Sequence, residues 1–353
     1  MLESSVKLLA MTGEAAVLVS KGRAIYANAE ARAVLGEDCA GKRVSELFGE
    51  LISGVQSPSF LAQVRLGSRA YLLRIARLDG DQIFFLRPQD ALPALLNEPF
   101  LYALRSSLMN LELAAGQLRA EAEALGSEKL LEGLQAVTRS QFQLQRLMNN
   151  ASLILSFSEG QAVCIPRVFS LSELCASVME AAGQMIPEIR FSFRGTEGVM
   201  VFADPRLIKD LLLNLLSNAV RHGQGCQRIS LSVLESERSV VLAVDDDGCG
   251  IPPEELPRVF DRYRHSFDLR QMGAGPGLGL TAARLIAQLH GGALLLESRP
   301  GQGTTLRVSL QRENAELMHA HAPGDSVVCD ARDLLTGLAD CLPPSCFREQ
   351  YLD

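Results

Sequence analysis

The stretch DLLLNLLSNAVRHG at residues 210–223 carries polar side chains at a helical spacing, with Asp210, Asn214 and Asn218 four residues apart. Side chains at this spacing lie on one face of an α-helix, which the pattern predicts over 204–222. Amide oxygens are hard ligands that suit Mg²⁺, and this face would present two of them together. Buried amides are also common on helices without any ligand, so a metal–phosphate site and a structural role both stay open for this run.

An acidic run, VDDDGCGIP at 244–252, follows a strand predicted at 239–245. The carboxylate of Asp246 is suited to accept a hydrogen bond from an exocyclic amine, and Gly248 and Gly250 would let a flat ring approach the backbone. A plain acidic turn, or a cation-binding loop made by the three aspartates, is the alternative.

A glycine-rich run, GAGPGLGLTAARLI at 273–286, opens a helix predicted at 277–290. Free N–H groups and the helix dipole favour phosphate at such an N-terminus. The run does not follow a strand directly, which disfavours a dinucleotide-binding fingerprint. A closing run, GQGTT at 301–305, joins the edge of the predicted sheet.

The order and spacing of these four runs resemble the ATP-binding domain of sensor histidine kinases, the Bergerat-type nucleotide fold, over residues 160–312. The resemblance implies ATP and Mg²⁺ as cofactors, with Asn218 as the metal ligand and Asp246 reading the adenine amine. It also implies that Arg221 and His222 face the phosphates. The full set of ATP-binding residues that it implies is Asn214, Asn218, Arg221, His222, Asp246, Gly248, Gly250, Gly275, Gly277, Leu278, Gly279, Leu280, Thr304 and Thr305.

The same resemblance assigns a lid and an adenine end to the pocket. The three glycines of GPGLG would shape a mobile lid, and Thr304 and Thr305 would line the adenine end. The run VFDRYRHS at 259–266 is one residue shorter than the family's pattern, which leaves open whether Arg262 or Arg264 reaches the phosphates.

The first helix of the family carries a phosphate-accepting histidine followed by an acidic base, and this chain departs from that pattern. Tyr102 aligns with the histidine and Ala103 with the acid, and no histidine lies between 91 and 160. Imidazole is nucleophilic near neutral pH, whereas a phenol with a pKa of about 10 stays protonated unless a base acts on it. Autophosphorylation at this position is therefore expected to fail, and Tyr102 is expected to be an aromatic residue flanking the helix seam.

Other residues offer weaker routes to the same chemistry. Asp210 is the alternative base on the predicted ATP-domain helix, while the amide of Asn214 stands where related hydrolases carry a glutamate, so ATP hydrolysis is expected to be slow. His319 and His321 are displaced acceptors or, more simply, solvated linker residues.

Two long helices are predicted between residues 97 and 155. The first has a strict heptad seam, and the second repeats the stepping with Gln141 as its one polar member. Two narrow seams do not bury each other completely, so a second copy is expected to complete a four-helix bundle in a homodimer. The alternative is that the hairpin packs on other parts of its own chain. The first seam consists of Leu101, Leu104, Leu108, Leu111, Ala115, Leu118, Ala122 and Leu125.

The fold class expected is α+β with several domains. Residues 1–90 show short alternating runs with helices near 28–35 and 45–51, and GRAIYANAEARAVLG at 22–36 resembles a PAS sensor domain, which implies an unidentified small ligand. The expected units are a PAS-like antiparallel sheet (1–90), the hairpin (91–160), an α/β-sandwich ATP-binding domain of histidine kinase type (161–312) and a tail of unknown role with a weak helical pattern (313–353). Further helices are expected at 170–182, and strands at 189–194, 228–235, 293–298 and 304–310.

Composition narrows the class of protein. A formal charge of −7 disfavours a nucleic-acid binder, and no run is apolar enough for a membrane span. The eight cysteines have no C-x-x-C pair, which suits free thiols in a reducing cytoplasm.

The leading expectation is a cytoplasmic, histidine-kinase-like protein of two-component signalling that binds Mg-ATP. By family it is a phosphotransferase with a response regulator as partner, although its own residues make self-phosphorylation doubtful. The alternatives are a non-enzymatic pseudokinase scaffold that binds a kinase or a response regulator, and a kinase that phosphorylates a partner protein in trans.

Overall fold

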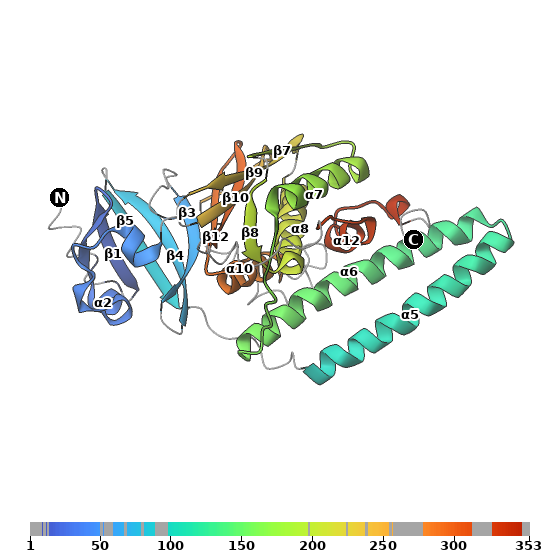
Figure 1. Ribbon diagram of the computed structural model, residues 1–353, viewed down its shortest axis with the longest axis horizontal. Helices are drawn as coiled ribbons and strands as arrows, with labels where there is room; N and C mark the ends of the chain where they lie inside the picture. Colours follow the sequence, from blue (N-terminus) through green and yellow to red (C-terminus); the bar gives the residue numbers. More distant parts are fainter. Residues whose placement is uncertain are drawn as a thin grey trace.

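The computed structural model describes most of the chain, and all structural statements below concern that part. The described residues are 9, 12, 14–49, 52, 59–66, 69–78, 81–88, 98–196, 198–223, 225–236, 239–253, 256, 278–312 and 327–347. A sheet-rich N-terminal unit, a central α/β layer and a protruding helical hairpin follow one another across the molecule (Figure 1).

The central layer is a sheet with helices packed against it. In the described part, its strands run in the order β11-β12-β10-β9-β7, with all neighbours antiparallel except the parallel pair β7 and β9. The strands are β7 (Arg190–Gly195), β9 (Arg228–Glu235), β10 (Ser239–Asp246), β11 (Leu294–Arg299) and β12 (Gly303–Gln311). The helices are α7 (Leu171–Met185), α8 (Pro205–His222) and α10 (Leu278–Leu289). Two short strands missed in the sequence, β6 (Arg167–Ser170) and β8 (Met200–Ala203), pair with each other at the start of the layer.

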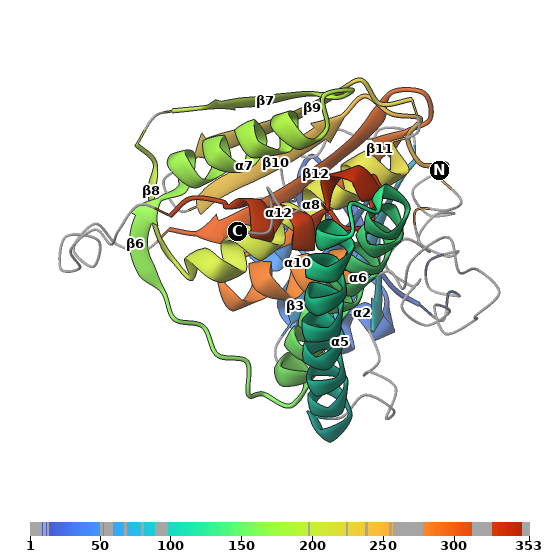
Figure 2. The same ribbon diagram turned by 90° about the vertical axis from the view of Figure 1, so that its right-hand side faces the viewer.

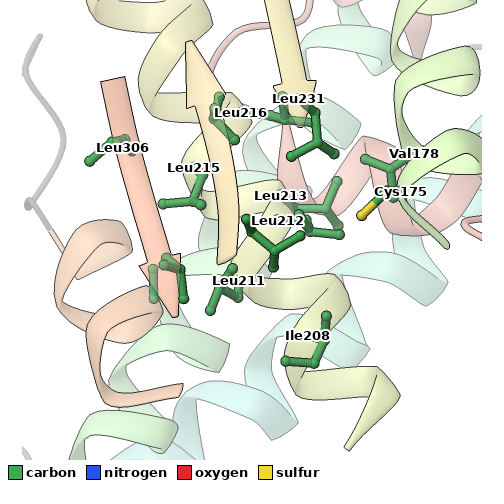
Figure 3. Close-up of a cluster of buried hydrophobic side chains, with 14 of the residues drawn as sticks. Cys175, Val178, Ile208, Leu211, Leu212, Leu213, Leu215, Leu216, Leu231 and Leu306 are labelled. Carbon is green, nitrogen blue, oxygen red and sulfur yellow. The ribbon is translucent and has the colours of Figure 1, made fainter. Parts of the chain in front are cut away.

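An aliphatic core lies between these helices and the sheet. Figure 3 shows leucines of α8 pointing toward Leu231 of β9 and Leu306 of β12, with Cys175 and Val178 of α7 closing one side. Leu211, Leu212, Leu215 and Leu216 are all fully buried. Because the apolar residues of α8 face this core, its polar positions are left on the opposite face.

The N-terminal unit is an antiparallel sheet in the order β2-β1-β5-β4-β3. Its elements are β1 (Ala15–Ser20), β2 (Arg23–Ala27), α2 (Ala29–Leu35), α3 (Val44–Phe48), β3 (Ser59–Leu66), β4 (Arg69–Leu78) and β5 (Asp81–Pro88), with a short 3₁₀ turn at Glu37–Cys39. Asn28 caps α2 by accepting from Ala31 N, so the helix predicted near 28–35 begins one residue later, at Ala29. The helix predicted at 45–51 is shorter in the structure, because Gly49 at φ 89° ends it.

The two sheets are joined edge to edge. Strand β3 pairs with β11 over three residues, so the described strands other than β6 and β8 form one continuous ten-stranded sheet. Leu295 of β11 is completely buried and completes the core of the N-terminal unit. Pairing an edge strand in this way satisfies backbone groups that would otherwise stay open.

The hairpin consists of α5 (Glu98–Ala124) and α6 (Glu128–Ser158), close to the ranges predicted. Every second member of the first seam is buried against α6: Leu101, Leu108, Ala115 and Ala122. Helix α6 also packs on α10 and on the C-terminal segment. This side of the hairpin is therefore covered by its own chain, as the alternative to a dimer expected. Within the described ranges, no helix is both long and apolar enough to cross a bilayer.

The C-terminal segment 327–347 is folded onto the central layer. It contains α12 (Ala331–Gly337) and a 3₁₀ turn at Pro344–Cys346, and it lies beside α6 and α8 in both views (Figures 1 and 2). Its leucines and Phe347 belong to the same core as α7 and α8. The weak helical pattern noted in this tail thus marks a packed element.

Candidate functional site

Helix α8 is the platform of the site. Asp204 caps its N-terminus by accepting from the N–H groups of Arg206 and Leu207, and Pro205 stands at the first helical position. Burial acts against the charge of Asp204, but the N–H groups of Ile165 and Arg206 outweigh it and lower the pKa of this carboxyl. The helix is therefore fixed at the end that leads to its polar face.

The first amide of that face, Asn214, is held by the hairpin. Its Nδ2 donates to Asn150 Oδ1 at 3.1 Å, and its Oδ1 accepts from Asn150 Nδ2 and Arg146 Nη2, both at 3.2 Å. All of its hydrogen-bonding atoms thus have protein partners, so Asn214 works as a structural link between α8 and α6 in this conformation.

The second amide, Asn218, is in a different situation. It is half-buried on the same helix face, one turn further on, and no residue in the described ranges hydrogen-bonds its side chain. An unpartnered amide oxygen at this place is suited to bind a hard cation such as Mg²⁺. The structure therefore separates two residues that look equivalent in the sequence.

Asp246 stands at the end of β10, against the C-terminal end of α8. Its Oδ1 accepts from Gly248 N at 3.0 Å and from Thr304 N at 3.3 Å, which fixes the carboxylate and leaves Oδ2 for another donor. A Cβ built on Gly223, directly after α8, would lie 3.6 Å from the same Oδ1. Desolvation raises the pKa of Asp246, and the two backbone N–H groups act against this rise.

The neighbouring aspartates, Asp245 and Asp247, accept hydrogen bonds from other parts of the protein. Asp245 accepts from the hydroxyl of Thr305 at 2.6 Å, and Asp247 accepts from the backbone N–H groups of Gln227 and Arg228 at 2.8 and 2.9 Å. Each of the three carboxylates is thus held by the protein through its Oδ1 atom, which favours a structured turn over the cation-loop alternative.

The two threonines expected at the adenine end point to opposite faces of β12, as adjacent strand residues do. Thr304 is opposite Asp246 in the register, and its hydroxyl lies 2.9 Å from that of Ser298. Thr305 is opposite Asp245 and bonds to it. Thr304 is therefore on the side of the open carboxylate, while Thr305 supports the adjacent strand from the other face.

Glycines around Asp246 allow the close approach of backbone segments. Gly250 and Gly303 have φ values of 68° and 86°, which L side chains rarely adopt. A Cβ on Gly248 would come within 2.9 Å of both Asp246 Oδ1 and Gly223 C. This loop can therefore keep its shape only with glycine at these positions.

The start of α10 meets the hairpin network. A Cβ on Gly279 would lie 2.9 Å from Asn214 Oδ1 and 3.4 Å from Arg146 Nη2. Leu278 packs in a cluster with Leu101 and Leu155 of the hairpin, and Leu280 packs in the central core. Gly275, Gly277, Arg262, Arg264, His319, His321 and the side chain of His222 lie outside the described residues.

Arg221 has a partner that the sequence gave no reason to expect. Its Nη1 lies 3.6 Å from Asp340 Oδ2 in the C-terminal segment, and the same oxygen lies 2.7 Å from Arg146 Nη1. The two residues are more than a hundred positions apart in the chain, so only the fold brings them together.

Tyr102 stands on the outer surface of α5. Its side chain is 76% exposed, and Ala103 beside it is exposed as well. This matches the expectation of an aromatic flanking the seam. Ala103 stands at the position where the family pattern has the acidic base.

A cavity of about 500 Å³ lies between the hairpin, α8 and α12. Asp210 lines it, and loss of solvation raises the pKa of this carboxyl to about 6, even though water reaches it from the cavity. Tyr102 is not among the lining residues, so Asp210 is not placed as its base.

The residues present fit a bound Mg-ATP. Among the described residues, none hydrogen-bonds the amide oxygen of Asn218 or Oδ2 of Asp246, and the backbone of Gly223 and Gly248 lies close to the Asp246 carboxylate. Asn218 lies on α8, and Asp246 lies against the C-terminal end of this helix at Gly223. The donor set thus has a hard oxygen suited to Mg²⁺ on Asn218 and a hydrogen-bond acceptor suited to an amine on Asp246.

Comparison with known proteins places this arrangement in context. A family model for the "Histidine kinase-, DNA gyrase B-, and HSP90-like ATPase" matches residues 203–314. The circadian input-output histidine kinase CikA of Synechococcus elongatus is 30% identical over 188 residues, which is 52% of this chain and 25% of that protein. The sensor histidine kinase YkoH of Bacillus subtilis is 29% identical over 188 residues, which is 53% of this chain and 41% of that protein.

Among solved structures, a crystal structure of histidine kinase ThkA in complex with response regulator protein TrrA is 23% identical, covers 87% of this chain and 98% of that chain, and has a TM-score of 0.41. The aligned parts span less than half of the two curated relatives above. Residues 203–314 thus match an ATPase family that includes histidine kinases, and the curated relatives of the wider segment are themselves histidine kinases.

Proposed function

We propose that this chain binds Mg-ATP at the junction of α8 and the end of β10, and acts as a histidine-kinase-type protein of two-component signalling. One observation carries the proposal: Asp246, which the described residues hold through Oδ1 and leave open at Oδ2, lies against the end of the helix that holds Asn218, whose amide has no partner among the described residues. The match of residues 203–314 to the ATPase family supports it.

The residues divide the work of binding. Asn218 would hold the metal ion, which neutralises phosphate charge when bound. Asp246 Oδ2 would accept from the adenine amine, since Oδ1 is occupied by two backbone donors. Thr304 orients that carboxylate, while Arg221 and His222 are assigned to the phosphates by the family resemblance. Asn214 is assigned a linking role, because its amide is used by Asn150 and Arg146.

We also infer that the protein is a homodimer and that α5 does not accept phosphate at position 102. Leu111 and Leu118 of α5 and Leu125 directly after it are exposed, and so are Leu144, Val137 and Leu130 of α6. We call these six residues the hairpin stripe. The contacts Arg119–Thr138 and Arg105–Ser152 set an antiparallel register that brings the stripe residues level in pairs, 111 with 144, 118 with 137 and 125 with 130. A second copy would cover this stripe and complete a four-helix bundle.

The N-terminal unit is proposed to be the sensor, of PAS type, and a response regulator is the proposed partner. Its aliphatic core, joined to β11 through β3, gives a physical route from a bound signal to the ATP-binding layer. A pseudokinase scaffold is the second candidate, and the replacement of the acceptor pair by Tyr102 and Ala103 favours it.

Incubation with γ-labelled ATP decides between these candidates. Wild type is expected to incorporate no label on α5, and the double variant Tyr102→His, Ala103→Glu is expected to gain acid-labile, base-stable label, because only the acceptor pair is missing. Absence of label in the double variant, with nucleotide binding intact, would favour the scaffold. Asn218→Ala is expected to abolish stabilisation by Mg-ATP in a thermal melt, and unchanged stabilisation would refute the assigned pocket.

A further inference from the structure

The C-terminal segment 327–347, here called the strap, is attached to two parts of the molecule at once. Leu334, Leu335, Leu338 and Phe347 are almost completely buried in the core of the ATP-binding layer. The ring of Phe347 also lies 5.6 Å from that of Phe142 on α6. Burial of this much apolar surface holds the strap in one place.

Polar contacts join the strap to the hairpin and to α8. Arg139 donates to the carbonyl oxygens of Ala339 and Asp340, both at 3.3 Å, and Gln143 donates to that of Ala339 at 3.3 Å. At the other end, Lys209 of α8 forms an ion pair with Asp333. The strap therefore connects α6 with α8, the helix that carries Asn218.

One carboxylate stands at the centre of these contacts. Asp340 Oδ2 lies 2.7 Å from Arg146 Nη1 and 3.6 Å from Arg221 Nη1, and the three side chains are largely enclosed. Arg146 in turn donates to Asn214. A continuous set of contacts thus runs from the strap through the hairpin to the helix face that carries Asn218.

We propose that the strap is an autoinhibitory element, in which the Asp340 carboxylate competes with the phosphates of the nucleotide for Arg221. The inference rests on the proposed function, since it takes Mg-ATP as the ligand of this face. Carboxylate and phosphate are the same class of partner for a guanidinium, so each displaces the other. The negative charge of Asp340 also repels a triphosphate at short range in a partly buried site.

Coupling between two such events is reciprocal. If the docked strap weakens nucleotide binding, bound nucleotide must loosen the strap by the same factor. Because the strap also fastens α6 to α8, its release would remove one of the connections between the hairpin and the ATP-binding layer and leave others, such as the Asn150–Asn214 pair, in place. Bound nucleotide would thus weaken the attachment of the hairpin to the ATP-binding layer through the strap.

Calorimetric titration of the full chain with Mg-ATP tests the competition. Asp340→Asn keeps the size of the side chain and is expected to bind Mg-ATP roughly five- to tenfold more tightly than wild type, as the loss of one nearby charge predicts. Asp333→Asn is the matched control: it removes the same charge from the same segment and an ion pair of similar exposure, but at Lys209. Its affinity is expected to stay within about twofold of wild type.

Hydrogen exchange on the wild-type protein gives a second reading that needs no strap variant. Saturating Mg-ATP is expected to speed exchange in the strap, including the amide of Leu338, which bonds to the carbonyl of Leu334. Asn218→Ala at the same Mg-ATP concentration is expected to show no change.

The outcomes separate the two proposals. Wild type that binds Mg-ATP, with Asp340→Asn no tighter or Asp333→Asn equally tight, overturns the strap proposal and leaves the function standing. Slower or unchanged strap exchange on binding also overturns it. If neither wild type nor Asp340→Asn binds Mg-ATP, the proposed function fails, and the strap proposal fails with it.

Discussion

At the scale of single residues, identical side chains differ through their partners. Asn214 and Asn218 share a helix face, yet the first is bonded on both amide atoms and the second has no partner in the described part of the chain. Asp245 accepts from the Thr305 hydroxyl, Asp247 from the N–H groups of Gln227 and Arg228, and Asp246 from those of Gly248 and Thr304. The sequence shows residue types and spacing, but the division of labour among them is set by contacts over long sequence separations.

The raised pKa of Asp210, whose carboxyl lines the cavity, predicts that a neutral residue at this position stabilises the fold. The size of this gain is expected to depend on pH. The Asp210 pKa of about 6 in the folded protein is above the ordinary value of 3.8, so the folded state binds more protons than the unfolded state between these values, and stability falls as pH rises through this window. Asp210→Asn should therefore raise the unfolding free energy at pH 7.5, by roughly 1 kcal/mol after allowing for water in the cavity. The gain should shrink toward pH 4.

Denaturant melts of wild type and Asp210→Asn at the two pH values check this. Glu112→Gln is the control, because Glu112 lines the same cavity but is exposed in its pair with Arg332. An equal effect of both substitutions, or a gain for Asp210→Asn that is larger at pH 4, would contradict the account.

The close approach of Gly279 to the side chain of Asn214 predicts that a larger residue at position 279 destabilises the protein. Gly279→Ala would push a methyl group against Asn214 Oδ1, which is held by Asn150 and Arg146 and has no free direction in which to move. We expect a loss of about 1–3 kcal/mol, as for a broken buried hydrogen-bond pair. Gly116→Ala in α5, where a Cβ meets nothing within 4 Å, should instead stabilise by up to about 1 kcal/mol. Thermal melts of the two variants give the signs, and a stabilising Gly279→Ala would refute the contact.

At the scale of elements, local sequence patterns predicted most of the described helices and strands. They did not predict which strands distant in the sequence pair with each other. The predicted strand at 228–235 and helix at 204–222 agree with β9 and α8 to within one residue, because alternation and heptad stepping report burial directly. The short pair β6 and β8 and the joint between β3 and β11 were not predicted, since neither has a local signature and each depends on a distant partner. The strap was visible only as a weak helical pattern for the same reason.

The hairpin stripe gives the prediction that belongs to this scale. Leu118→Asp on α5 should convert the proposed dimer to a monomer in light scattering, because it places a charge in the middle of the apolar stripe. Leu113→Asp should leave the oligomeric state unchanged, since Leu113 is 67% exposed on another side of the same helix. A wild-type monomer, or equal effects of both variants, would contradict the proposed bundle.

At the scale of the whole molecule, three connections tie the parts together. The β3–β11 pair continues the sheet from the N-terminal unit into the central layer, the Asn150–Asn214 pair joins the hairpin to that layer, and the strap bridges the same two parts. The mixed α/β class was predictable because the sequence contains stretches of both helical and alternating periodicity. The docking of the units was not, since it rests on single residues such as Leu295, Arg146 and Asp340 that carry no pattern.

The central claim is that Asp246 and Asn218 bind the two ends of Mg-ATP, and nucleotide selectivity tests it most directly. Inosine triphosphate has the same phosphates as ATP but lacks the exocyclic amine that Asp246 Oδ2 would accept, so a site built around this carboxylate must reject it. Calorimetric titration of the wild-type chain should show saturable uptake of Mg-ATP and at least about tenfold weaker binding of Mg-ITP. Equal affinity for both nucleotides, or no heat with Mg-ATP, would contradict the account.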